Sequence, residues 1–181
     1  FTVEDIIWTG PQPTLVELGA QVGVEACHPS VALGEYIATA QKGGRTIHHL
    51  PPYRGETKIA LASLLGVSID ALHAGKSAEL MFAVAEMREV KSAEEIRALE
   101  EAFHIGYDMH LTAMRMCREG VVEREIAAAI EGVAKSHGQA VSFPSIVSQH
   151  GETLHNLNCD GVLESGRLLL VDAGGESLAN Y

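Results

Sequence analysis

The sequence has few cysteines, no long hydrophobic run and no recognisable signal peptide, and each shortage excludes a class of protein. Its three cysteines, Cys27, Cys117 and Cys159, are an odd number at wide spacings, which suits neither a disulfide framework nor a zinc ribbon. A reducing cytoplasm is therefore the expected location. No apolar run approaches the roughly 18 residues of a membrane span, so no membrane partner is expected.

Basic residues are also scarce. The chain has 13 Lys and Arg against 24 Asp and Glu, a net charge of −11. Nucleic acids and anionic membrane surfaces bind cationic faces, so neither is expected as a partner. An acidic chain can still be an enzyme whose carboxylates hold divalent cations.

Several familiar catalytic motifs are missing. The sequence contains no HExxH, CxxC, GxSxG or GxGxxG. It therefore lacks the motifs that usually identify classical zinc peptidases, serine hydrolases and dinucleotide enzymes. Lys76-Ser77 resembles the end of a phosphate-binding loop, but Asp70 stands where the first glycine is needed, and Ser77 is better explained as a helix N-cap. His104 and Asp108 share a helix face, which an ordinary solvated surface explains as well as a metal site does.

What the chain does have is 46% hydrophobic residues in two kinds of pattern. Residues 1 to 90 alternate between short apolar runs and helical patterns, which is typical of an α/β domain. The expected elements are a strand over 5–8, helices over 13–20 and 31–41, a strand over 45–50, and helices over 56–65 and from Ser77 onward.

Residues 91 to 181 begin with a capping box, Ser92 to Glu95, which predicts a long helix that ends at Gly120. A second helix is expected from Glu123 to Gly138, with Ile126, Ile130 and Val133 on one apolar face. The predicted buried stripe of the first helix is Ile96, Leu99, Phe103, Tyr107, Leu111 and Met114. Strands are expected over 143–149 and 167–172, with a turn or a third strand over 154–163.

The candidate site consists of His155 and Asp172. The apolar run Leu168 to Val171 reads as a buried strand that delivers the Asp172 carboxylate at its end, and a strand end can hold a ligand rigidly. Taken alone, a histidine before a turn and an aspartate after a strand are also common in turns that have no functional role.

An ordered series of short motifs favours a functional role for the two residues over a purely structural one. The series is Val90 to Ile96, Glu119 to Ile126, Phe143 to Val147, His155, and Gly166 to Gly174. It resembles the creatinase, prolidase and aminopeptidase P group of pita-bread metallopeptidases. The resemblance implies an α/β N-terminal domain remnant of creatinase type over residues 1–90, followed by the first half of an α+β pita-bread catalytic domain over residues 91–181.

For the site, the resemblance implies that Asp172 is a metal ligand and that His155 is a catalytic residue outside the metal shell. The parent protein would be a dinuclear aminopeptidase or dipeptidase with two divalent ions, Mn²⁺ first and Zn²⁺ or Co²⁺ as alternatives. Its substrate would be a peptide with proline in the second position, and it would act as a homodimer. The remaining ligands would lie beyond Tyr181, so the chain is expected to be a fragment and inactive alone.

Two other functions stay open at this stage: a metal-free, creatinase-like amidinohydrolase and a non-catalytic pita-bread binding module. A carboxylate at the end of the strand argues against the first, and the presence of both His155 and Asp172 argues against the second. The chain departs from the group at Val122, where a capping Thr or Ser is usual and worth about 1 kcal/mol. It departs again at Asn156, where many aminopeptidase P sequences have an aromatic residue.

Overall fold

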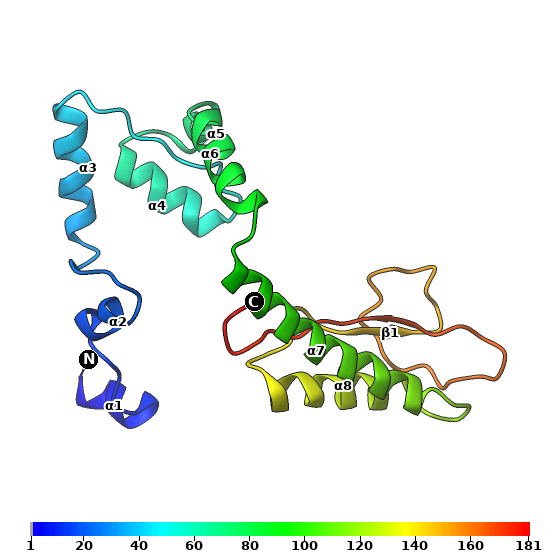
Figure 1. Ribbon diagram of the computed structural model, residues 1–181. Helices are drawn as coiled ribbons and strands as arrows, with labels where there is room; N and C mark the ends of the chain where they lie inside the picture. The colour runs from blue at the N-terminus through cyan, green and yellow to red at the C-terminus, as the bar shows by residue number, and fades with distance from the viewer. Residues whose placement is uncertain (1) are drawn as a thin grey trace. The chain divides into compact units, whose positions relative to one another are not determined.

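The computed structural model describes residues 2–181, and the contacts within it divide the chain into two units, one ending at Met87 and one beginning at Arg88 (Figure 1). Each unit has its own set of packed elements and is described by itself. None of the helices described in residues 2–181 is both long and apolar enough to cross a membrane.

Helices are the only regular secondary structure among the described residues of the first unit. Its helices are α1 (Val3–Thr9), α2 (Leu15–Gln21), α3 (Ala32–Lys42), α4 (Gly55–Leu65), α5 (Ile69–Ala74) and α6 (Ala78–Glu89), the last of which runs into the second unit. The helices predicted over 13–20, 31–41, 56–65 and from Ser77 are confirmed, and Ser77 Oγ accepts the Leu80 N–H as predicted for an N-cap. The short helix α5 was not predicted.

Both strands predicted in the first unit are wrong, and with them the α/β pattern for residues 2–87. Residues 5–8 lie in α1, where Asp5 and Thr2 form a capping box: the Thr2 N–H donates to Asp5 at 2.7 Å and the Asp5 N–H to Thr2 Oγ1 at 3.2 Å. A local cap of this kind starts a helix without a tertiary partner. Residues 45–50 form no strand, because no second strand pairs with them among the described residues of this unit.

The second unit consists of two helices and a two-stranded antiparallel ribbon. Helices α7 (Ala93–Met116) and α8 (Glu123–His137) pack together, and strands β1 (Ile146–Ser148) and β2 (Leu170–Asp172) pair in the register Val147 to Val171. Both strands lie within the predicted ranges but are shorter. The third strand allowed for residues 154–163 is absent there except for a single bridge between Val122 and Val162.

The predicted buried face of α7 is wrong. Its buried residues are Ala98, Ile105, Met109 and Ala113, whereas four of the large residues predicted to be buried are exposed: Ile96, Phe103, Tyr107 and Met114. The α7 sequence is apolar on more than one side, and the side with alanines faces α8. That side also carries Ile105 and Met109, which fill the core beside the α8 isoleucines, while Ala113 leaves room for the facing helix.

The core of the second unit lies where α7, α8 and the ribbon meet. Fully buried Ile126 and Ile130 of α8 pack with Met109 of α7, with Val147 of β1 and with Leu163. The predicted face of α8 is confirmed at its two isoleucines. This core therefore fixes one face of the ribbon against the helices and leaves the other face for the loops.

The ends of these helices are capped in two different ways. At α7 the predicted capping box is confirmed: the Ser92 N–H donates to Glu95 at 2.7 Å, and the Glu95 N–H donates to Ser92 Oγ at 3.2 Å. Helix α7 ends at Met116, before the predicted Gly120. At α8, Val122 supplies no side-chain cap, but the N–H groups of the first two helical residues donate to the carbonyls of Gly161 and Cys159 at 2.8 and 2.9 Å. The loop backbone thus replaces the cap that the sequence lacks.

Candidate functional site

Asp172 is the last residue of β2 and is exposed. Successive side chains of a strand point to opposite faces. Because Val171 packs against the core beside the helices, Leu170 and Asp172 point to the face of the ribbon away from them. On β1, Ile146 stands opposite Asp172 and Ser148 opposite Leu170, so these two residues belong to the same face.

His155 lies in the segment 149–161, which connects β1 to the residues before β2. The His155 residue itself is exposed. Two contacts place this segment on the Asp172 face. A Cβ at Gly151 would lie 3.2 Å from the Leu170 Cβ, so the segment crosses directly over Leu170. Asn156, the neighbour of His155, donates its side-chain N–H to Ser148 Oγ at 3.1 Å. Figure 1 shows the loop that follows β1 on the side of the ribbon away from α7 and α8, and the end of the segment returns to the start of α8.

Glu123, the first residue of α8, anchors both ends of that segment. Its carboxylate accepts the Gln149 N–H at 2.7 Å and the Gly161 N–H at 3.1 Å, and the side chain is buried, with 2% exposed. Ser148, which is fully buried, also accepts the His150 N–H at 3.0 Å. Sequence reasoning did not identify either residue, because contacts with a segment that folds back over the ribbon follow no periodic pattern in the sequence.

Neither predicted site residue is held by a hydrogen bond or an ion pair to another described side chain. An exposed carboxylate without a partner is available to a cation, and an exposed imidazole can donate or accept a proton. Residues 2–181 contain no group of three His, Cys, Asp or Glu side chains close enough to hold a metal ion. The described residues therefore fit one ligand of a metal centre but not a complete one. His104 and Asp108 are both exposed on α7 and belong to no such group.

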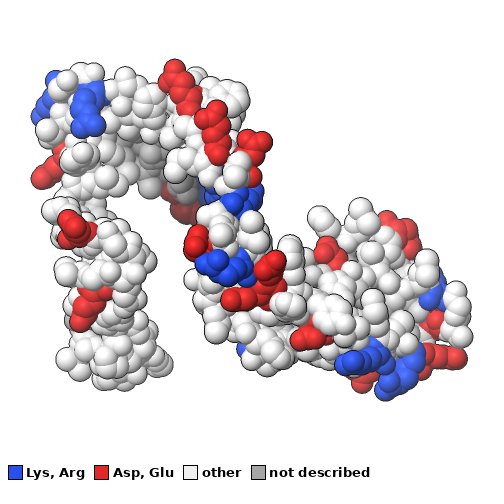
Figure 2. Space-filling model, in the orientation of Figure 1, with Lys and Arg blue, Asp and Glu red and all other residues white. Residues whose placement is uncertain are grey.

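Two pairs of ionisable side chains include residues of the segment 149–161. His150 Nδ1 lies 3.0 Å from Glu152, and the Glu152 pKa is lowered, first by a backbone hydrogen bond and then by this histidine. Arg124 pairs with Asp160 at 3.2 Å. In Figure 2, acidic side chains are spread over both units, and no continuous basic stripe covers the described residues on the side in view.

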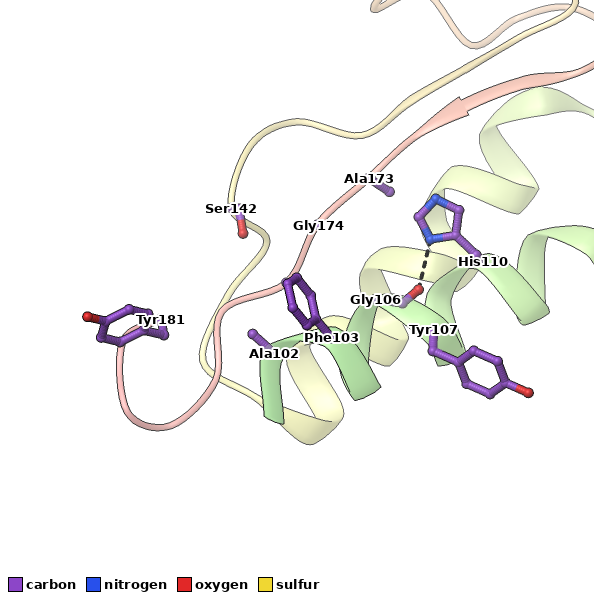
Figure 3. Close-up of a pocket in the computed structure, with 10 residues that line it drawn as sticks. Ala102, Phe103, Gly106, Tyr107, His110, Ser142, Ala173, Gly174 and Tyr181 are labelled. Atoms are coloured by element: carbon purple, nitrogen blue, oxygen red, sulfur yellow. Dashed lines mark hydrogen bonds between the residues drawn. The ribbon is translucent and has the colours of Figure 1, made fainter. Parts of the chain in front are cut away.

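A cavity of about 510 Å³ lies on the opposite face of the ribbon, between α7 and the residues after β2 (Figure 3). Phe103, Tyr107 and His110 of α7 and Gly174 and Tyr181 are among the residues that line it. His110 Nδ1 already bonds the Gly106 carbonyl at 2.8 Å, so its free nitrogen is the one imidazole atom available there. The cavity is mostly apolar and does not include the predicted site residues.

Comparison with known proteins shows similarity to a metallopeptidase family. Residues 97–181 match the model of metallopeptidase family M24. The Xaa-Pro aminopeptidase of Escherichia coli is 36% identical over 96 residues, which are 51% of this chain and 22% of that protein. The Xaa-Pro dipeptidase of Pyrococcus furiosus is 33% identical over 94 residues, 50% of this chain and 27% of that protein.

Among solved structures, aminopeptidase PepP of Pseudomonas aeruginosa superposes with a TM-score of 0.73 at 21% identity, covering 97% of this chain and 41% of that one. Proline aminopeptidase P II of Yersinia pestis gives a TM-score of 0.71 at 23% identity, covering 96% and 42%. At these identities the superposition shows the fold alone. The predicted resemblance to the aminopeptidase P and prolidase group is confirmed, and the chain spans about two fifths of the length of these structures.

Proposed function

We propose, from the premise that residues 97–181 belong to metallopeptidase family M24, that the protein hydrolyses the Xaa-Pro bond at the N-terminus of peptides with divalent metal ions. In this proposal Asp172 is a metal ligand and His155 contacts the substrate. The residues over 91–181 act as the first half of the catalytic domain, and Mn²⁺, a cytoplasmic location and a homodimer are part of the same proposal.

The observation that carries the proposal is that the segment with His155 lies on the same face of the ribbon as Asp172. The segment with His155 is bound to Ser148 through Asn156, and Ser148 lies on the Asp172 face of the ribbon. The segment that carries His155 and the strand end that carries Asp172 therefore belong to the same face of the ribbon, within the part of the chain that matches a metallopeptidase family, and this supports the proposal.

Each side chain has a distinct chemical task. A carboxylate oxygen is a ligand that Mn²⁺ accepts readily, and Zn²⁺ or Co²⁺ also bind it. Bound divalent ions would polarise the carbonyl of the substrate and activate a water molecule. The His155 imidazole can donate a hydrogen bond to charge that develops on the carbonyl oxygen, which helps only if the ring is held near that oxygen. Proline in the second position removes the N–H that general peptidases bind, so such bonds call for a dedicated site.

The test uses protein expressed from its complete reading frame, with Asp172→Ala, His155→Ala and the matched control Asp160→Ala. Hydrolysis is measured on a dipeptide and a tripeptide with proline second and on the same peptides with alanine second, beside metal content by elemental analysis. We expect Asp172→Ala to lose metal and activity, His155→Ala to lose activity at nearly normal metal content, and Asp160→Ala to lose neither, because its carboxylate pairs with Arg124.

The outcomes separate the rival functions. Equal metal loss in the Asp172 and His155 variants would contradict the division of roles. Metal-free protein that hydrolyses an amidino compound such as creatine but no peptide would favour the amidinohydrolase type, and metal-free protein that hydrolyses neither would favour a binding module. Calorimetric titration of the 181-residue chain with Mn²⁺ adds a further check, because one carboxylate predicts weak binding and tight binding at two sites would contradict the ligand assignment.

A further inference from the structure

Glu123 is a buried acidic residue to which the proposed function assigns no task. Carboxylates are rarely fully buried, because leaving water is costly unless hydrogen bonds replace the lost hydration. Glu123 is 2% exposed and begins α8, where the positive end of the helix dipole favours a negative charge. A group that is buried at such a cost is expected to fix something specific.

What it fixes are the two ends of one segment. The carboxylate accepts the N–H of Gln149 through one oxygen and the N–H of Gly161 through the other, at 2.7 and 3.1 Å. The backbone adds a second tie, since the Glu123 N–H donates to the Gly161 carbonyl at 2.8 Å. One side chain therefore closes the segment that carries His155.

The fit around the carboxylate is close. A Cβ at Gly161 would lie 2.7 Å from Glu123 Oε1, nearer than nonbonded atoms come, so the segment approaches the carboxylate in a way that only glycine allows. In the middle of the segment, Asn156 is bound to Ser148 Oγ at 3.1 Å. Both ends and the centre of the segment are thus attached to α8 and β1, while the His155 side chain has no hydrogen-bond or ion-pair partner among residues 2–181.

We propose that Glu123 is a positioning residue for His155: its carboxylate sets where the segment 149–161 lies over the Asp172 face and thereby where the imidazole meets the substrate. The inference rests on the proposed function for the role of His155, but the attachment of the segment is independent of it. A general stabilising role alone would predict a less stable protein with an unchanged turnover rate.

The experiment compares Glu123→Gln with Glu125→Gln, an exposed carboxylate in the same turn of α8 that accepts only the Val122 N–H. A glutamine keeps the shape at residue 123 but turns an N–H group toward one of the two backbone donors. We expect the Gln149 or Gly161 amide to exchange with solvent about tenfold faster, or more, since a hydrogen bond to a charged acceptor is lost. The control is expected to change neither amide.

The kinetic arm uses the protein from the complete reading frame. In Glu123→Gln we expect kcat for an Xaa-Pro peptide to fall about ten- to a hundredfold through displacement of His155, with metal content and KM nearly unchanged. Ser148→Ala, which removes the acceptor for Asn156 and leaves the charge in place, is expected to lower kcat in the same way. Because this variant does not disturb the buried carboxylate, it tests the positioning even if Glu123→Gln folds poorly.

Unchanged exchange at both amides would overturn the attachment, and faster exchange with wild-type kcat in both variants would overturn the positioning role. If the unsubstituted protein hydrolyses no Xaa-Pro peptide, the proposed function fails, and the exchange rates of the two amides still decide whether Glu123 holds the segment.

Discussion

Gly175 lies where the chain leaves the ribbon and passes between α7 and α8, and a methyl group there has a predictable cost. A Cβ at this position would stand 2.8 Å from Ile105 Cγ2, 3.2 Å from the Ala134 Cβ and 3.4 Å from Met109 Sδ. Methionine can move, but Ile105 is β-branched and held in its helical rotamer, and Ala134 has no other rotamer. Gly175→Ala therefore has to displace helix atoms.

Overpacking of a close core costs roughly 1 to 3 kcal/mol in the free energy of unfolding. The matched control is Gly132→Ala on α8. Gly132 is exposed in the helix interior, and nothing lies within 4 Å of a Cβ placed there. Alanine in a helix interior is favoured over glycine by about 0.5 to 1 kcal/mol. The two glycine-to-alanine changes are thus expected to have opposite signs and to differ by about 1.5 to 4 kcal/mol.

The assay has to report on the second unit alone. The only tryptophan, Trp8, lies in α1 of the first unit, so its fluorescence does not follow this core. Native-state amide exchange of the buried Ile126 and Ile130 in α8 gives the free energy of unfolding of the second unit directly. A Gly175→Ala protein as stable as the unsubstituted one, beside a stabilised Gly132→Ala, would refute the packing argument.

Three further predictions concern the helix ends. Val122→Thr is expected to stabilise the second unit by less than about 0.5 kcal/mol, below the usual ~1 kcal/mol of an added cap, because loop carbonyls already accept the first N–H groups of α8; amide exchange in α8 checks this. Ser92→Ala should weaken the start of α7 by about 1 kcal/mol, seen as faster exchange of the Glu95 amide, and a loss confined to distant residues would contradict the capping box. Tyr181→Phe removes a 2.6 Å hydrogen bond to Glu95, which raises the Tyr181 pKa from 10.0 and is the first cause of the lowered Glu95 pKa. The stability that the bond adds should be present at pH values between the tyrosine and glutamate titrations. It should fall as the pH rises through the raised tyrosine pKa, and also as the pH drops through the lowered glutamate pKa. If the difference in unfolding free energy between the two proteins does not vary with pH, that would argue against the bond.

Helices set by local chemistry were predictable from the sequence. The Ser92 to Glu95 capping box and the isoleucines of α8 need only neighbours three or four residues away, and both are found as predicted. The strand predicted over 5–8 failed for a related reason: an apolar run of four residues suits a helix as well as a strand, and the Thr2 cap favours the helix.

The positions of His155 and Asp172, and the family motifs around them, could be read from the sequence, because a strand end and an ordered motif series are linear features. Which side of α7 is buried could not, since two apolar sides compete and only the close approach of α8 selects the one with alanines. Nor could the sequence show that a carboxylate at Glu123 closes the segment that carries His155. That contact joins backbone groups 26 and 38 residues away, and such pairs meet only once the helices and the ribbon have packed.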